Sequence, residues 1–332
     1  PVVASSAGNH AQGVAYAATQ NGIRSTIVMP RAAPIAKVQA TEGYGARVVL
    51  CGDCYDDAYA RAMEICEEEG ATFLHPFNDY EVMAGQGTIG LEILSQLPTV
   101  DTVIVPVGGG GLLAGVATCI KQANPRVRVV GVQAEGADAV VRSYREGHLT
   151  ESENVSTIAD GIAVKCPGDK TVELIMKYAD DMVTVSDNDI SAAILMLMER
   201  TKQIVEPSGA ASLAAVLSGH IDVKDRKAVC LLSGGNIDVS VIHRVVELGL
   251  VSRHRRLKFF VRLNDAPGSL MKLLQVVADS NANILTINHD RMCLSLTPSE
   301  ILVHIGSEVG GQHHADTLIE NLTAAGYSPT LE

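Results

Sequence analysis

Tryptophan is absent from this chain of 332 residues, and only 4% of the residues are aromatic, although 47% are hydrophobic. Such a composition, with 30 glycines, favours an α/β protein over an all-β sandwich. No apolar run reaches the ~18–20 residues that a membrane-spanning helix requires, so we expect no membrane partner. The length allows two domains, at least one of them with a large core.

Positively charged residues are also few. The chain has 26 Lys and Arg and 38 Asp and Glu, which gives a net charge of −12. Nucleic acids and anionic membranes need clustered positive charge, so we expect neither as a partner. A small anionic ligand stays compatible with this charge, because backbone N–H groups can hold it without Lys or Arg.

The sequence offers little for metal or nucleophilic chemistry. Its seven cysteines, at positions 51, 54, 66, 119, 166, 230 and 293, include one C-x-x-C pair and no second pair that would complete a zinc site. No H-E-x-x-H motif, catalytic triad or carboxylate pair is recognisable. We therefore predict no metal, and reduced thiols in a cytoplasmic protein.

Strand-like and helix-like stretches alternate as far as about residue 250. Continuous β-branched runs separated by amphipathic helices predict an α/β fold with a mainly parallel sheet that is covered on both faces. The predicted strands are 2–4, 23–29, 47–50, 72–74, 103–107, 127–132, 182–185 and 228–232, and the main predicted helices are 35–44, 56–69, 82–96, 111–122, 190–203 and 207–217.

The pattern changes at a short basic segment, residues 253–258. The stretches beyond it predict strands at 257–263, 284–290 and 300–306, helices at 268–280 and 312–325, and a last strand at 327–331. This βαββαβ order is the ferredoxin-like arrangement. We therefore predict a first domain over residues 1–253 and a second over residues 257–332.

Three loops that follow predicted strands carry glycine or short polar side chains. The first is Ser5-Ser6-Ala7-Gly8-Asn9-His10, where a strand gives way to a helix and backbone N–H groups point at one spot. Its hydroxyls and amide suit a carboxylate or phosphate, but ordinary helix capping also explains them. The third loop is Ser233-Gly234-Gly235-Asn236, either a turn or part of a site at the carboxyl end of a strand.

The second loop is Gly108-Gly109-Gly110-Gly111-Leu112. Four glycines let the backbone approach a phosphate closely, at the start of a helix that supplies donors. The alternative is a dinucleotide site, which has G-x-G-x-x-G and an acid about 20 residues on. Gly108, Gly110 and Glu135 fit that pattern, but Leu113 stands at its third glycine, so a nucleotide-binding regulatory protein stays an alternative function.

Five motifs in order resemble the fold type II pyridoxal-phosphate enzymes and, among them, the threonine dehydratases. The motifs are SSAGNHAQG (5–13), AGQGTI (84–89), GGGGL (108–112), EPSGAA (206–211) and SGGN (233–236). The resemblance covers essentially the whole chain. It implies a lyase that uses pyridoxal phosphate to convert L-threonine, and also L-serine, into an oxoacid and ammonia.

The resemblance also implies roles for single residues. The cofactor phosphate would be held by Gly108, Gly109, Gly110, Gly111 and Leu112; the cofactor ring by Asn9, Gly161 and Ser233; and the substrate by Ser5, Ser6, Gly8, Asn9, His10 and Gln86, with Asn78 nearby. The hydroxyl of Ser233 would not keep the ring nitrogen protonated, which favours elimination. No lysine here, Lys37 included, matches the motif of the family's Schiff-base lysine, which lies upstream of SSAGNH. We therefore expect a missing segment before Pro1 and no turnover by this chain alone.

Serine racemases resemble the same pattern but carry a second acid–base serine where this chain has Ala7, so dehydration is favoured over racemisation. The C-terminal unit resembles an ACT regulatory domain. That resemblance implies a site for an amino-acid effector, isoleucine or valine, formed by Asn264, Asp265, Pro267, Gly268, Asn283 and Ile284. A dimerisation module without a ligand is the alternative, and a homo-oligomer, dimer or tetramer, is expected in either case.

Overall fold

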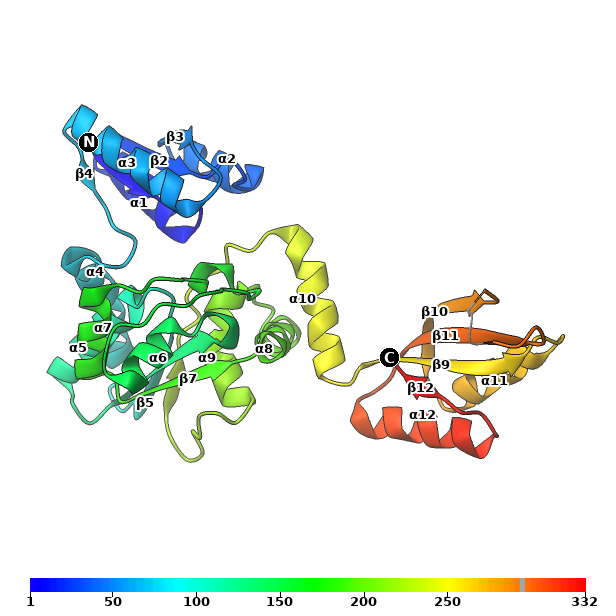
Figure 1. The fold of residues 1–332 in the computed structure, drawn as a ribbon. Coiled ribbons are helices and arrows are strands. Elements are labelled where there is room, and N and C mark those ends of the chain that lie inside the picture. Colours follow the sequence, from blue (N-terminus) through cyan, green and yellow to red (C-terminus); the bar gives the residue numbers. More distant parts are fainter. Residues whose placement is uncertain (293–295) are drawn as a thin grey trace. The chain divides into compact units, whose positions relative to one another are not determined.

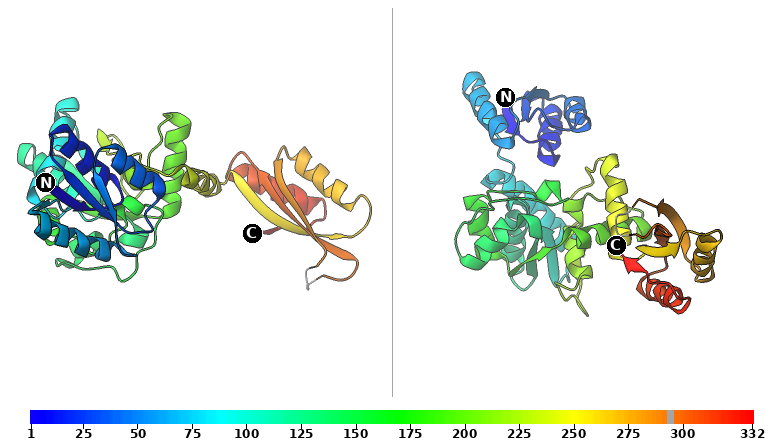
Figure 2. Two further views of the ribbon diagram at one scale, coloured as in Figure 1. Left: turned by 90° about the horizontal axis from the view of Figure 1, so that it is seen from above. Right: turned by 45° about the vertical axis from the view of Figure 1, so that its right-hand side comes forward.

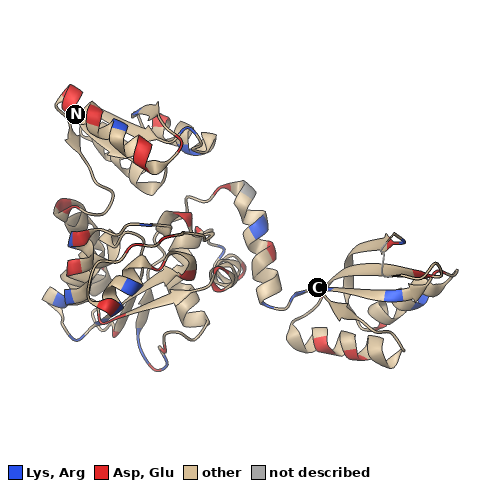
Figure 3. Cartoon of the chain, in the orientation of Figure 1, with Lys and Arg blue, Asp and Glu red and all other residues tan. Residues whose placement is uncertain are grey.

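The computed structural model describes residues 1–292 and 296–332, so Cys293 lies outside the described residues. The chain divides into two compact units, Pro1–Ile242 and His243–Glu332 (Figure 1, Figure 2). The division falls inside helix α10 (Val239–Ser252), whereas the sequence placed the boundary at the basic segment after this helix. Lys and Arg are interspersed with Asp and Glu along both units (Figure 3).

The first sheet of the larger unit has four parallel strands in the order β3-β2-β1-β4. Alternate residues of β1 point to opposite faces: Ala4 packs with Ala11 of α1, and Val3 packs with Ile65 of α3. Both faces are therefore covered by helices. The elements are β1 (Val2–Ser5), α1 (Asn9–Gln20), β2 (Ser25–Met29), α2 (Ile35–Gly43), β3 (Arg47–Leu50), α3 (Tyr55–Glu69) and β4 (Thr72–Phe73).

The second sheet is also parallel, in the order β7-β6-β5-β8. All five residues of β5 are buried, as the continuous run Thr102–Pro106 predicts for a central strand. Val103 and Val105 lie in one large hydrophobic cluster, and Ile104, which faces the other way, is also fully buried. The strands are β5 (Thr102–Pro106), β6 (Arg128–Ala134), β7 (Asp181–Val185) and β8 (Ala228–Cys230).

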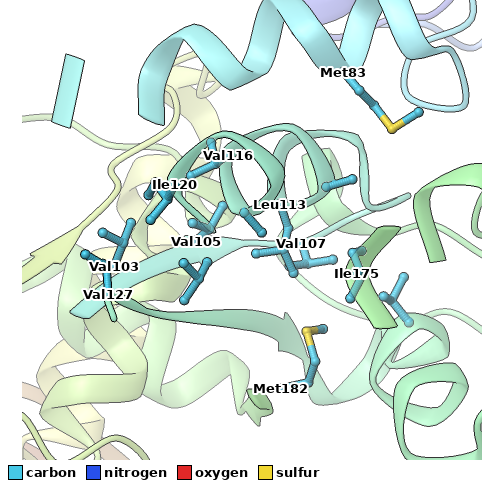
Figure 4. Packing of buried hydrophobic residues seen from close by; sticks show 14 of the residues in the cluster. Met83, Val103, Val105, Val107, Leu113, Val116, Ile120, Val127, Ile175 and Met182 are labelled. Carbon is cyan, nitrogen blue, oxygen red and sulfur yellow. The ribbon is translucent and has the colours of Figure 1, made fainter. Parts of the chain in front are cut away.

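Six helices accompany this sheet: α4 (Tyr80–Gln96), α5 (Gly111–Ala123), α6 (Ala139–Glu146), α7 (Asp169–Tyr178), α8 (Asp187–Arg200) and α9 (Pro207–Leu217). Short 3-10 turns occupy η1 (Glu135–Ala137) and η2 (Asp160–Ile162). The main hydrophobic cluster packs α4, α5 and α7 onto β5 and β6, with Leu113 and Ile120 of α5 at its centre (Figure 4). The predicted parallel α/β fold is confirmed, but α6, α7 and α10 were not predicted.

Helices α4 and α5 approach each other through glycine. A Cβ atom on Gly115 would collide with the carbonyl oxygen of Met83 and lie 2.9 Å from the Gly87 nitrogen. Both are backbone atoms, which cannot rotate away as a side chain can. The absence of a side chain at this position therefore sets the spacing of the two helices.

The smaller unit is an antiparallel sheet in the order β10-β11-β9-β12, with both helices on one face (Figure 2). Phe259 of β9 and Leu318 of α12 are fully buried in the core between them. The observed order is the predicted βαββαβ: β9 (Arg256–Asn264), α11 (Ser269–Asp279), β10 (Asn283–Asp290), β11 (Glu300–Glu308), α12 (Gln312–Ala324) and β12 (Thr330–Leu331). Among the described residues, no helix is both long enough and apolar enough to cross a membrane.

We expect Gly115→Ala to lower the free energy of unfolding by about 3 kcal/mol, the upper end for overpacking, because backbone of α4 must move. The matched control is Gly85→Ala on α4, where nothing lies within 4 Å of the added Cβ. That variant should be as stable as the wild type or gain up to about 1 kcal/mol of helix propensity. Urea unfolding measures both, and equal midpoints for the two variants would contradict the close approach.

Candidate active site

The three glycine-bearing or polar loops all begin where a parallel strand ends. Strand β1 runs into Ser5–Asn9, β5 into Gly108–Gly110, and β8 toward Ser233–Asn236. The first two loops each continue into a helix, α1 and α5. This edge of a parallel sheet is where open α/β folds bind ligands.

The glycine loop is shaped for an anion. Gly110 adopts φ +97° just before α5, a conformation that strains a residue with a side chain. Helix α5 has 13 residues, and its first backbone N–H groups have no partner within the helix. They carry the positive end of the helix dipole, so the loop presents several aligned donors to a phosphate.

Two side chains support this loop from behind. The Thr171 hydroxyl lies 2.7 Å from the Gly109 carbonyl oxygen and 2.9 Å from that of Gly168, so its single proton is shared between them. The Phe77 ring occupies the space beside Gly109, where a Cβ would lie 2.5 Å from ring carbons. Thr171 is fully buried. The conformation of the loop is therefore fixed by tertiary contacts.

The polar loop after β1 is joined to the Ser233 loop through Glu206. The Asn9 amide nitrogen Nδ2 donates a hydrogen bond to Oε1 of Glu206 over 2.8 Å. The backbone N–H of Glu206 donates to the carbonyl oxygen of Gly234 over 3.0 Å. A Cβ on Gly234 would collide with Glu206 Oε1 and lie 3.0 Å from Asn9 Nδ2. Asn9 and Gly234 are thus immediate neighbours across this carboxyl group.

Gly161 extends the same cluster to the glycine loop. A Cβ on Gly161 would lie 2.8 Å from the Ser208 hydroxyl, next to Glu206. On its other side, a Cβ on Gly108 would lie 3.3 Å from the Gly161 carbonyl oxygen. The structure therefore brings Asn9, Gly108, Gly161 and the Ser233–Gly234 turn into one contiguous group.

The other residues predicted to bind the substrate or the cofactor differ in burial and in their hydrogen bonds. Ser5 is fully buried and Ser6 accepts a hydrogen bond from the Gly8 nitrogen, while Ser233 is exposed. The His10 ring nitrogen Nε2 lies 2.9 Å from the Leu74 carbonyl oxygen, and burial lowers the pKa of this histidine. His10 is thus uncharged at neutral pH and can serve only as a neutral hydrogen-bonding group.

Asn78 follows Phe77, which packs against the glycine loop, and Gln86 lies near Gly115 of α5. The Asn78 amide donates to Asp169 over 2.7 Å and accepts from the Lys170 nitrogen over 3.1 Å, so it caps the start of α7. Gln86 is partly buried on α4. Neither observation tests a role in binding, and the roles assigned to the individual site residues stay predictions.

Two features of the site were not predicted from the sequence: Glu206, and the ion pair between Lys37 and Asp160, whose Nζ and Oδ2 atoms are 2.9 Å apart. Glu206 is 5% exposed, and burial is the main cause of its raised pKa. A single acidic residue within the apolar stretch 204–216 was the signal that could have revealed it. Its partner Asn9 is 197 positions away and could not be inferred from spacing.

The site fits pyridoxal phosphate by its donor set. Backbone donors at the glycine loop suit the phosphate, and the Asn9 amide suits a phenolic oxygen. Among the described residues, five buried hydroxyls have no hydrogen-bond partner, and two of them, Ser5 and Ser208, lie beside the site and can donate to a ligand.

Comparison with known proteins identifies the family. Residues 1–234 match the model of the pyridoxal-phosphate dependent enzyme family. The chain belongs to this family. The match decides between the two interpretations of the glycine loop: the cofactor is pyridoxal phosphate, and the dinucleotide alternative falls.

Two curated relatives illustrate the similarity. The chain is 48% identical over 326 residues to an L-threonine ammonia-lyase of Thermotoga maritima, covering 98% of this chain and 81% of that protein. It is 50% identical over 252 residues to the catabolic L-threonine dehydratase of Staphylococcus aureus, covering 75% of this chain and 73% of that protein. The first alignment includes most of the smaller unit.

Solved structures agree with the larger unit. The processed threonine deaminase isoform 2 of Solanum lycopersicum has a TM-score of 0.72 at 42% identity, over 74% of this chain and 73% of that chain. Maize serine racemase has a TM-score of 0.70 at 37% identity, over 76% of this chain and 78% of that chain. The predicted fold type II architecture, lyase class and cofactor of this pyridoxal-phosphate enzyme are thus confirmed.

Thr171→Val should weaken the binding of pyridoxal phosphate. Valine keeps the shape but leaves the Gly109 carbonyl without this donor, which should also cost about 1–3 kcal/mol of stability. Thr171→Ser retains the hydroxyl and is the matched control. Cofactor fluorescence and urea unfolding give both quantities, and equal affinities for the Val and Ser variants would show that Thr171 does not support the loop.

Proposed function

We propose that this enzyme is a threonine ammonia-lyase, which converts L-threonine into 2-oxobutanoate and ammonia. L-Serine, which carries the same β-hydroxyl, is the second substrate we expect. The observation that carries the proposal is the contiguous group of Asn9, Gly108, Gly161 and Gly234, which gathers loops from both parallel sheets around one ligand position. The threonine-specific activities named for the relatives support the choice of substrate.

Pyridoxal phosphate, when bound, withdraws electrons from the substrate Cα and so makes loss of its proton and of the β-hydroxyl feasible. The chain binds and orients both molecules. The backbone N–H groups of Gly108–Leu112 hold the phosphate, and Asn9 donates to the ring hydroxyl oxygen. Ser5, Ser6, Gly8 and His10 hold the substrate carboxylate through neutral donors, with Gln86 beside them; His10 uses its backbone N–H, because its ring Nε2–H already donates to Leu74.

Ser233 faces the ring nitrogen in this proposal. A hydroxyl cannot keep that nitrogen protonated as a carboxylate would. With an unprotonated ring nitrogen the bound cofactor would withdraw electrons from Cα less strongly, which would favour loss of the β-hydroxyl over reprotonation of Cα. Ser233 therefore directs the reaction toward elimination.

Serine racemase is the second candidate, because such enzymes are among the structural neighbours at 37% identity. A racemase needs a proton donor on each face of the Cα centre. Ala7 occupies the position where the resemblance implies the second donor, and a methyl group cannot supply a proton. Ala7 therefore favours the lyase.

The smaller unit binds an amino-acid effector in this proposal, and the enzyme works as a homo-oligomer. A pocket of about 280 Å³ is lined by Asp265, Ala266, Pro267, Gly268, Leu270, His289, Arg291 and Ile301. Arg291 makes two hydrogen bonds to the Asp265 carboxylate, over 2.8 and 3.0 Å, and holds its pKa below the usual value. The two opposite charges suit the ammonium and carboxylate of a free amino acid.

Three of the six predicted effector residues, Asp265, Pro267 and Gly268, line this pocket. Asn264 lines a neighbouring pocket of about 260 Å³. Asn283 is exposed at the start of β10, and Ile284 packs against the core of the unit. A role for these last two in effector binding rests on the resemblance alone.

Ser233→Asp should lower kcat for L-threonine at least about tenfold, because a carboxylate beside the ring nitrogen keeps it protonated. Ser233→Ala, which adds no charge, should lose less. The assay measures 2-oxobutanoate release by the full-length protein with pyridoxal phosphate. Absence of release by the wild type would refute the proposed activity, whereas an unimpaired Asp variant would refute only the role of Ser233.

L-Isoleucine or L-valine should bind the full-length protein and shift its threonine saturation curve. Asp265→Ala should weaken that binding about tenfold by removing one charge-assisted contact. Arg145→Ala, an exposed change on α6, is the control. Isothermal calorimetry that detects neither amino acid would favour a dimerisation module without a ligand.

A further inference from the structure

Glu206 is a buried carboxyl group to which the reaction outlined above assigns no task. It is the residue immediately before α9, is 5% exposed, and is followed by Pro207 at the first helical position. A carboxylate in such a place costs free energy unless hydrogen bonds compensate its charge. Burial of this carboxyl group in an otherwise apolar stretch therefore requires compensating hydrogen bonds.

The hydrogen bond with Asn9 is one such compensating interaction. An ionised carboxylate can only accept hydrogen bonds, so the amide end that faces Glu206 Oε1 at 2.8 Å must be the nitrogen. The Asn9 amide is thereby prevented from turning over. One N–H of Nδ2 is used by Glu206, and the second stays free to donate to another acceptor.

The carboxyl group itself has little freedom. A Cβ on Gly234 would collide with Oε1, so the glycine at this position leaves just enough room for the carboxyl group, and a Cβ on Gly161 would be in ordinary contact with it at 3.8 Å. The backbone N–H of Asn236 also donates to this carboxylate. The Asn9 amide is therefore held by a group that is fixed in place.

We propose that Glu206 is a positioning residue that orients the Asn9 amide so that its second N–H donates to the ring hydroxyl oxygen of the cofactor. The inference rests on the proposed function, because it takes the cofactor ring to lie beside Asn9. It adds to that function a residue that acts only through Asn9. Replacement of Glu206 should therefore weaken cofactor binding only while both Asn9 and the ring hydroxyl are present.

The charge state of Glu206 gives a second consequence. Burial raises its pKa, as does the nearby Asp160 carboxylate, while the Asn9 and Asn236 hydrogen bonds and Lys37 oppose the rise. As the pH falls through this raised pKa, Glu206 gains a proton and can donate to Asn9 Oδ1. The amide is then free to turn over, so cofactor affinity should fall on the acid side.

The test uses the reduced adduct of pyridoxal phosphate and L-threonine, phosphopyridoxyl-L-threonine, which carries the ring hydroxyl and needs no covalent bond to the protein. Calorimetry gives its affinity for the wild type, Glu206→Gln, Asn9→Ala and the double variant. We expect Glu206→Gln to weaken binding of this adduct about tenfold when Asn9 is present. In the Asn9→Ala background the same change should alter affinity by less than about twofold.

Two further measurements separate positioning from a structural role. The adduct made from 3-deoxypyridoxal phosphate lacks the ring hydroxyl and should bind the wild type and Glu206→Gln equally. The acid-side fall in affinity should disappear in Glu206→Gln and persist in the control Glu92→Gln, an exposed change on α4. Equal losses in both backgrounds, or with both adducts, would overturn the positioning role. Failure of the wild type to bind either adduct would instead remove the proposed function on which it rests.

Discussion

The site depends on one geometric constraint, that all strands within each sheet of the larger unit run in the same direction. Parallel strands place their carboxyl ends, and the helix N-termini that follow them, along one edge of each sheet. The Asn9–Glu206 hydrogen bond then joins the loop of the first sheet to the Gly234 turn after the second. Without that shared direction, Asn9 and Glu206, which are 197 positions apart, would not be brought together.

Close packing of the backbone also helps to form the site. Gly115 lets α4 approach α5, and the buried Thr171 hydroxyl ties the Gly109 carbonyl to the start of α7. Both contacts bear on the N-terminal half of α5, whose free N–H groups we propose as the anion-binding element. These two contacts thus help to fix the position of the α5 N-terminus.

The sequence predicted elements whose signal is local. Strand β5 is an unbroken apolar run because both its faces are buried, and the order of the smaller unit follows from clear changes of period. Helices α6 and α7 were missed because they are short, with 8 and 10 residues, and follow irregular segments. Asn9 and the glycine loop could be singled out by residue type, but the pairing of Asn9, at the start of α1, with Glu206 spans 197 positions and only tertiary structure reveals it.

A net charge of −12 is on average unfavourable for binding a phosphorylated cofactor and a carboxylate substrate. The arrangement of the site resolves this conflict. Lys37 is paired with Asp160 at 2.9 Å, and burial lowers the pKa of His10, so neither side chain adds net positive charge at neutral pH. In the proposed function, attraction for anions comes instead from oriented peptide groups at helix N-termini, which need no counter-ion and lose no side-chain entropy on binding. A site built in this way is compatible with an acidic protein, and its affinity depends on the exact orientation of a few dipoles, among them the Asn9 amide.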